Sequence, residues 1–322
     1  MNTIIKKVAV LGAGAVGAYV LYGLSDIYKE KLWVIAKGER AERLKANGLV
    51  INGIPYTLNV RSPKEAHGAD LLVVCLKYAA LADALPDIRD VSGPNTTIIS
   101  LMNGVDSEDI ISQVIPRDQI IHALIRIASQ HKGNQITFPL PEKNMGIFYG
   151  LPETHDKADK KPVAAERMQR LEALQSCLGE SKMVTHLSND ILKEIWKKYA
   201  LNISINIPQA ILSVGTGVYS DSTHASFMSE ALCNEVVNLA GSYGIDIQSS
   251  DVLSGSGASS IPKSSRYSTL QDLDAKRPTE IDMFCGTVMR LGHEKGISVP
   301  YNTFAYHLIK GLEEKNEGRF DY

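Results

Sequence analysis

Residues Lys6–Leu24, KKVAVLGAGAVGAYVLYGL, decide the fold of the amino-terminal half. A short β-rich run, VAVL, leads into glycines with the spacing GxGxxG, and an apolar helical pattern follows. Gly12 permits a tight turn, Gly14 lets the backbone approach a pyrophosphate, and Gly17 lets the helix pack close to the strand. The helix amino terminus then offers N–H groups and a positive dipole to phosphates. Unless this is a purely structural glycine turn, the loop binds a dinucleotide through Gly12, Ala13, Gly14, Ala15, Val16 and Gly17.

The residues after the second strand indicate which dinucleotide is bound. An NAD site usually has Asp or Glu at the end of this strand, about 20 residues beyond the glycines. Here the strand LWVIA runs into Lys37, which is followed by Gly38, Glu39 and Arg40. A lysine and a nearby arginine attract a 2′-phosphate, with a gross attraction of about 4 kcal/mol per pair of charges before desolvation. The sequence therefore predicts NADP(H) with Lys37 as a cofactor contact, the alternative being a solvated basic loop.

Two further apolar runs, ADLLVVCLKYAAL and TTIISLMNGV, have the composition of parallel strands that are covered on both faces. The first ends at Lys77 and the second at Asn103. Ligands of open parallel sheets lie beyond the carboxyl ends of the strands. Lys77 and Asn103 are therefore candidates to contact cofactor or substrate.

The pattern changes near Ser188 from strands and helices to long helices alone. We expect an α/β Rossmann-type NADP-binding domain over residues 1–187 and an all-α helical substrate-binding domain over 188–322, with substrate in the cleft between them. Residues 249–266, rich in Ser and Gly, are expected to form a mobile loop. In TEIDMFCGTVMRLGHEKGI, a first-turn Pro278 would place Glu280 in the first helical turn.

The stretch IWKKYALNISIN, Ile195–Asn206, predicts a helix that is apolar nearly all the way round. One polar line interrupts it, formed by Lys198, Asn202 and Asn206, which lie along one seam because four residues advance about 400°. The line either satisfies neighbouring helices or forms a site. In a site, a protonated amine stabilises the charge that hydride transfer places on a ketone oxygen and then donates its proton. The two amides offer donors and acceptors without adding charge.

The motifs GAGAVG, CLKYA, MNG, WKKYALNISIN and STLQDLDAKRPTEID occur in this order across nearly the whole chain. This combination resembles the ketopantoate reductase (2-dehydropantoate 2-reductase) family. The resemblance implies a Rossmann domain plus a helical domain, and NADPH-dependent reduction of ketopantoate to pantoate for pantothenate and coenzyme A biosynthesis.

The same resemblance assigns roles to individual residues. Lys198 would be the proton donor, Asn202 and Asn206 would bind substrate, Asn103 would contact substrate and cofactor, and Lys77 would lie close to both. Ser268 would bind substrate, and Glu280 would lie near the cofactor. Two positions depart from the family pattern, since Thr216 replaces a third substrate asparagine and Ala80 replaces a glutamine. We therefore include Thr216 among the predicted substrate contacts.

Composition limits the remaining possibilities. The chain of 322 residues is 44% hydrophobic and 22% charged with a net charge of −2, which indicates neither a nucleic-acid nor a membrane partner. Four cysteines lie far apart without a CxxC pair, which is typical of reduced thiols in a cytoplasmic protein. No metal site is expected, because no His/Cys/Asp cluster has ligand spacing. The expected partner is a small 2-oxo acid, and the helical domain has room for a homodimer surface.

Two alternatives remain open at this point. The first is a related NADPH-dependent reductase of another 2-oxo acid, which the shorter hydroxyl of Thr216 would suit. The second is an NADPH-sensing protein without turnover, which would keep the three glycines but would not need Lys198 beside two asparagines.

Overall fold

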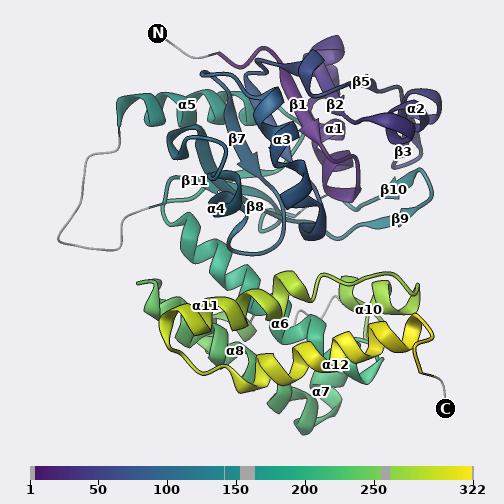
Figure 1. Cartoon of the computed structure of the whole chain (residues 1–322), viewed down its shortest axis with the longest axis vertical. Helices are drawn as coiled ribbons and strands as arrows, with labels where there is room; N and C mark the ends of the chain where they lie inside the picture. Colours follow the sequence, from purple (N-terminus) through teal and green to yellow (C-terminus); the bar gives the residue numbers. More distant parts are fainter. Residues whose placement is uncertain (1–3, 141, 153–163, 255–261, 321–322) are drawn as a thin grey trace. The chain divides into compact units, whose positions relative to one another are not determined.

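The computed structural model describes residues 4–140, 142–152, 164–254 and 262–320 (Figure 1). The chain forms two compact units, Met1–Ile191 and Leu192–Tyr322. The first combines sheets with helices, and the described part of the second consists of helices and loops. The predicted fold class, a Rossmann-type domain followed by an all-helical domain, is confirmed.

An eight-stranded sheet with the order β12-β11-β8-β7-β6-β1-β2-β5 forms the centre of the first unit (Figure 1). Its strands, in chain order, are β1 (Val8–Leu11), β2 (Leu32–Ile35), β5 (Asn59–Arg61), β6 (Leu71–Val74), β7 (Thr97–Ser100), β8 (Ile120–Arg126), β11 (Gly146–Gly150) and β12 (Thr185–Leu187). The neighbouring strands in the part of the sheet ordered β8-β7-β6-β1-β2-β5 all pair in parallel, whereas β11 runs antiparallel to β8.

Helices cover both faces of this sheet, which explains why its strands are continuous apolar runs. The helices of the first unit are α1 (Ala15–Tyr28), α2 (Gly38–Asn47), α3 (Leu81–Val91), α4 (Ser107–Ile111) and α5 (Ala165–Gly179). On one face, α1, α2 and α5 pack against Val8, Val10, Val34 and Val73. On the other, α3 and α4 pack against Ala9, Leu11, Ile35 and Val74. Alternate residues of each strand thus enter two separate cores.

A smaller sheet of order β4-β3-β10-β9 lies outside the sequence prediction. It joins β3 (Leu49–Ile51) and β4 (Ile54–Tyr56) to the hairpin of β9 (Gln130–Lys132) and β10 (Gln135–Thr137). The hairpin strands β9 and β10 pair antiparallel, as do β8 and β11 in the larger sheet. The pairing of β3 with β10 is parallel and joins distant segments, so no local pattern signals it.

The second unit is built around the 22-residue helix α6 (Ile191–Leu212), whose first residue belongs to the first unit. The other helices are α7 (Val218–Asp221), α8 (Thr223–Ser242), α9 (Ser249–Leu253), α10 (Ser268–Asp274), α11 (Thr287–Lys295) and α12 (Pro300–Asn316). The predicted mobile loop 249–266 contains α9, and its residues 255–261 lie outside the described part of the chain.

The predicted start of the helix that becomes α11 is wrong. Pro278 and Glu280 precede helical structure, which begins as a π-helix (Asp282–Gly286) before α11. The backbone N–H and the hydroxyl of Thr279 both donate to the Glu313 carboxylate on α12, each at 2.7 Å. That carboxylate therefore holds Thr279 outside helical structure, where a first helical turn was expected.

The turn between β1 and α1 depends on two glycines. Gly12 has φ of +108°, and a Cβ there would lie 2.7 Å from the Cys75 carbonyl carbon. A Cβ on Gly17 would overlap the Gly12 carbonyl oxygen and lie 3.0 Å from its carbon. The tight turn and close helix–strand packing predicted for these glycines are confirmed. At Gly14, by contrast, an added Cβ has nothing within 4 Å.

This difference yields a stability prediction. Gly17→Ala should lower the free energy of unfolding by about 1–3 kcal/mol, because the new methyl meets fixed backbone and must displace the helix. Gly14→Ala, the matched control three residues earlier in the chain, should change the free energy of unfolding by less than about 0.5 kcal/mol. Chemical denaturation followed by circular dichroism measures both. Equal stabilities of the two variants would contradict the proposed packing constraint.

Candidate active site

The glycine loop presents an open backbone surface at the start of α1. Gly14 is the N-cap residue without a side-chain cap, and the first turn of α1 carries no acidic side chain. Together with the free space at Gly14, this leaves room for a phosphate group against helix N–H groups. The structure therefore fits the dinucleotide predicted from the sequence.

The sheet brings the predicted cofactor residues of the first unit to one edge. The glycine loop, Lys37, Lys77 and Asn103 follow β1, β2, β6 and β7, which are adjacent parallel strands in the order β7-β6-β1-β2. Parallel strands end at the same edge, so these four segments share it. Lys37 and Lys77 are exposed there, and Asn103 is half-buried.

A hydrogen bond joins two of these loops. The Tyr78 hydroxyl, next to Lys77, donates to a carboxylate oxygen of Asp106 at 2.9 Å, three residues beyond Asn103. Asp106 is buried, and the following Ser107 hydroxyl contacts the Ser100 hydroxyl of β7 at 2.8 Å. The sequence alone does not indicate Tyr78 or Asp106, because a tyrosine and an aspartate 28 residues apart form no motif.

Lys37 has a partner that the sequence did not reveal. Its Nζ lies 2.6 Å from Oδ1 of Asp87 on α3. The Lys37 side chain is 61% exposed, whereas that of Asp87 is only 16% exposed. The Asp87 carboxylate therefore lies beside Lys37, the cation that follows β2, although no Asp or Glu occupies the end of β2 itself.

In the second unit, α6 carries the predicted polar line. Asn206 is buried, and Lys198 and Asn202 are partly buried, while Tyr199, Ala200, Ile203 and Ile207 around them are fully buried. The Tyr199 hydroxyl donates to the Phe284 carbonyl at 2.6 Å and lies 3.1 Å from that of Met283. Tyr199 therefore ties α6 to the π-helix, and the helix that presents Lys198 is held from its apolar side.

Gln209, one turn beyond the polar line, holds the segment that leads to Ser268. Its amide donates to the Ser265 carbonyl at 3.0 Å and accepts from the Tyr267 N–H at 2.7 Å. Ser268 is the exposed first residue of α10. Gln209 is a polar residue in an apolar helix, and the structure shows it fully buried. Its polarity in the sequence could have suggested a buried hydrogen bond. Its partners are backbone groups, which no sequence pattern identifies.

Thr216 holds the same segment. Its hydroxyl donates to the Pro262 carbonyl at 3.0 Å, and its N–H donates to the Ser265 carbonyl at 3.0 Å. The hydroxyl proton of Thr216 is therefore used in a loop contact, which gives this departure from the family pattern a structural role. Substrate binding by Thr216 remains a prediction.

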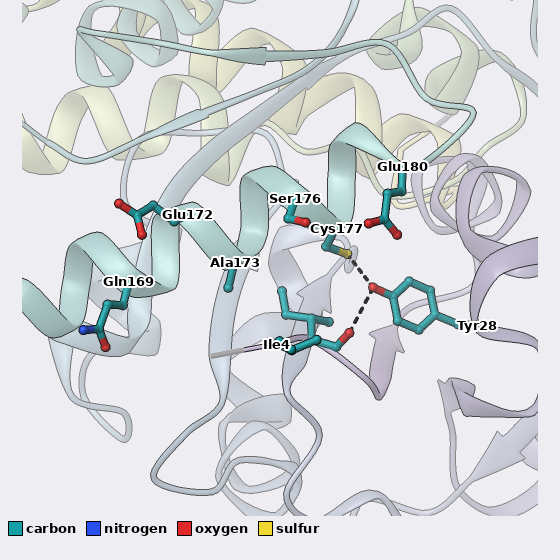
Figure 2. A pocket seen from close by; sticks show the side chains of 9 residues that line it. Ile4, Tyr28, Gln169, Glu172, Ala173, Ser176, Cys177 and Glu180 are labelled. Atoms are coloured by element: carbon teal, nitrogen blue, oxygen red, sulfur yellow. Dashed lines mark hydrogen bonds between the residues drawn. The ribbon is translucent and has the colours of Figure 1, made fainter. Parts of the chain in front are cut away.

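A separate pocket of about 210 Å³ lies in the first unit between α1, α5 and the segment before β1 (Figure 2). The Tyr28 hydroxyl sits 3.1 Å from Cys177 Sγ and 3.3 Å from the Ile5 carbonyl oxygen. Burial raises the pKa of the Cys177 thiol to about 11, so it stays protonated at neutral pH. The pocket lies at the amino end of β1, and its Glu172 and Glu180 would repel phosphates. It is therefore unsuited to the dinucleotide.

All four cysteines, Cys75, Cys177, Cys233 and Cys285, are buried free thiols. In the described part of the chain, no group of three His, Cys, Asp or Glu side chains is arranged to hold a metal ion. Within the same residues, no helix is long and apolar enough to cross a membrane.

A glycine turn at the carboxyl edge of a doubly wound parallel sheet defines the class of Rossmann-type dinucleotide-binding proteins. The family model described as "Ketopantoate reductase PanE/ApbA" matches residues 8–140, and its "C terminal" counterpart matches residues 190–313. The chain belongs to the ketopantoate reductase family, as the ordered motifs predicted.

Individual relatives span the whole chain. A 2-dehydropantoate 2-reductase of Streptococcus pyogenes serotype M3 is 25% identical over 95% of this chain and 97% of its own length. A ketopantoate reductase structure from Ralstonia eutropha JMP134 has a TM-score of 0.78 at 24% identity, covering 97% of this chain and 99% of the other.

D-mandelate dehydrogenase is similar as well. Its ternary structure with NADH and anilino(oxo)acetate has a TM-score of 0.82 at 24% identity, covering 97% of this chain and 99% of the other. Its complex with NADH has a TM-score of 0.77 at 25% identity, covering 96% and 99%.

The two hydrogen bonds from the Gln209 side chain to the backbone of Ser265 and Tyr267, here called the Gln209 clamp, yield a second stability prediction. Gln209→Leu should lower the free energy of unfolding by about 1–3 kcal/mol, because the partly buried Tyr267 N–H loses its acceptor and the Ser265 carbonyl keeps only the Thr216 N–H. It should also speed amide hydrogen exchange in residues 262–268. Gln248→Leu is the matched control, since Gln248 is exposed and its amide contacts the surface carboxylate of Asp246 at 3.3 Å. Unchanged exchange in Gln209→Leu would contradict the clamp.

Proposed function

We propose that this protein reduces the 2-oxo group of ketopantoate to give pantoate, with NADPH as the hydride source and Lys198 as the proton donor. The observation that carries the proposal is the polar line on α6 in a chain of the ketopantoate reductase family. The reaction would serve pantothenate and coenzyme A biosynthesis.

The polar line suits this chemistry. Reduction of a ketone places negative charge on its oxygen, which a protonated amine can stabilise before it donates the proton. Lys198 precedes Asn202 and Asn206 by one and two helical turns, so the amides can hold substrate hydroxyl and carboxylate groups while the amine faces the carbonyl. A nicotinamide cofactor supplies the hydride.

Further residues take supporting roles in the proposal. Glycine-loop residues and Lys37 would bind the cofactor phosphates, and Lys77 and Asn103 would contact cofactor or substrate. Ser268 and Thr216 would contact the substrate, and Glu280 would lie near the cofactor. The free space at Gly14 and the shared sheet edge support the cofactor part of this assignment.

A related reductase of another 2-oxo acid is the second candidate. It is favoured by the likeness to D-mandelate dehydrogenase, whose structure contains anilino(oxo)acetate, and by the departures at Thr216 and Ala80. The same mechanism would then act on a substrate with a different side chain. An NADPH-sensing protein without turnover is the third.

Nicotinamide absorbance during turnover tests these candidates. We expect fast NADPH oxidation with ketopantoate, and slow oxidation with simpler 2-oxo acids. Oxidation with another 2-oxo acid alone would reassign the substrate. Tight NADPH binding without any oxidation would refute the proposed enzymatic activity and favour an NADPH-sensing protein.

The role of Lys198 is tested with its neighbour as the control. Lys198→Ala should lower kcat by about 10²–10⁴-fold, which is the typical contribution of a general acid. Lys197→Ala should keep kcat within a few-fold, because Lys197 lies about 100° away around α6. Circular dichroism would verify that both variants fold. A Lys198→Ala enzyme as fast as Lys197→Ala would exclude Lys198 as the proton donor.

A further inference from the structure

We infer that Asp87 restrains Lys37 and thereby weakens the discrimination between NADPH and NADH, so that the chain uses both cofactors. This inference rests on the proposed dinucleotide site. It concerns a residue of α3 that neither the glycine motif nor the strand-tip rule includes.

The contact itself is specific. Lys37 Nζ lies 2.6 Å from Asp87 Oδ1, a charge-assisted hydrogen bond of short length. The Asp87 side chain on α3 is only 16% exposed, while the Lys37 side chain is 61% exposed. The carboxylate is therefore the more enclosed partner of this pair.

Other charges on α3 add to this effect. Asp83 lies one turn before Asp87 and thus on the same side of the helix. With Asp90 and Arg89, the helix Leu81–Val91 carries three carboxylates and one cation. Lys37 therefore pairs with a helix that is negatively charged overall.

A 2′-phosphate would compete with Asp87 for Lys37. To bind the phosphate, the ammonium group must leave the carboxylate or be shared between two anions, and either change reduces the gain from the added phosphate charge. A cofactor without this phosphate meets no such conflict. NAD-selective Rossmann proteins place a carboxylate at the end of the second strand. Here α3 supplies a carboxylate beside the residue that follows β2, so the rule based on the strand tip alone overstates the preference for NADP.

Binding of two nucleotide fragments tests this inference without turnover. 2′,5′-ADP is AMP with an added 2′-phosphate, so the ratio of the dissociation constants of 2′,5′-ADP and AMP, measured by calorimetry, isolates the 2′-phosphate. In the full-length wild-type protein we expect 2′,5′-ADP to bind within about tenfold of AMP. Asp87→Asn should improve 2′,5′-ADP binding about five- to tenfold and change AMP binding less than about twofold.

A double variant shows whether Asp87 acts through Lys37. In a Lys37→Met background, Asp87→Asn should no longer improve 2′,5′-ADP binding, because no cation remains to be released. Asp90→Asn is the matched control. It removes the same charge from α3 and should change the ratio less than about twofold. The NADPH-to-NADH ratio of kcat/KM should rise in Asp87→Asn by the same factor as the binding ratio.

The outcomes separate this inference from the proposed function. If Asp87→Asn leaves the binding ratio unchanged while Lys37→Met lowers it, the role of Asp87 is refuted and the dinucleotide site stands. A gain that persists in the Lys37→Met background would also refute it. If neither fragment binds the wild-type protein, the proposed dinucleotide site itself fails.

Discussion

The close contact between α1 and the turn that follows β1 sets the geometry of the first unit's candidate site. Because Gly17 has no side chain, its backbone lies directly against the Gly12 carbonyl group. The start of α1 is thereby held next to the end of β1, at the edge where β2, β6 and β7 also end. Gly14, between the two glycines, faces open space. Close packing on one side of the loop and free space on the other leave helix N–H groups accessible to an anion.

In the second unit, some residues of α6 hold neighbouring segments in place, and others form the candidate site. Tyr199 and Gln209 hold the π-helix and the segment before α10, respectively, through bonds to backbone groups. The Tyr219 hydroxyl donates in turn to the Ile205 carbonyl of α6 itself. These bonds fix the surroundings of the helix, while Lys198, Asn202 and Asn206 form a separate line along it. A rigid helix is suited to place reacting groups accurately.

Local patterns predicted most of the fold. The glycine turn, the buried parallel strands and the long helices follow from spacing and composition, and the strand tips placed Lys37, Lys77 and Asn103 at one edge. The pairing of β3 with β10 joins distant segments and was not predictable. The start of the helix containing Glu280 was wrong because Glu313 of α12 binds Thr279. The partner of Lys37 was missed for the same reason, since Asp87 is 50 residues away.

The central claim, that a dinucleotide binds at the edge where β1, β2, β6 and β7 end, is tested most directly by amide hydrogen exchange with and without NADPH. We predict slower exchange in Ala13–Val16 and in the segments that begin at Lys37, Lys77 and Asn103. Exchange around Tyr28 and Cys177, which line the separate pocket at the other end of β1, should not change. Protection confined to that pocket, with unchanged exchange in Ala13–Val16, would contradict the account.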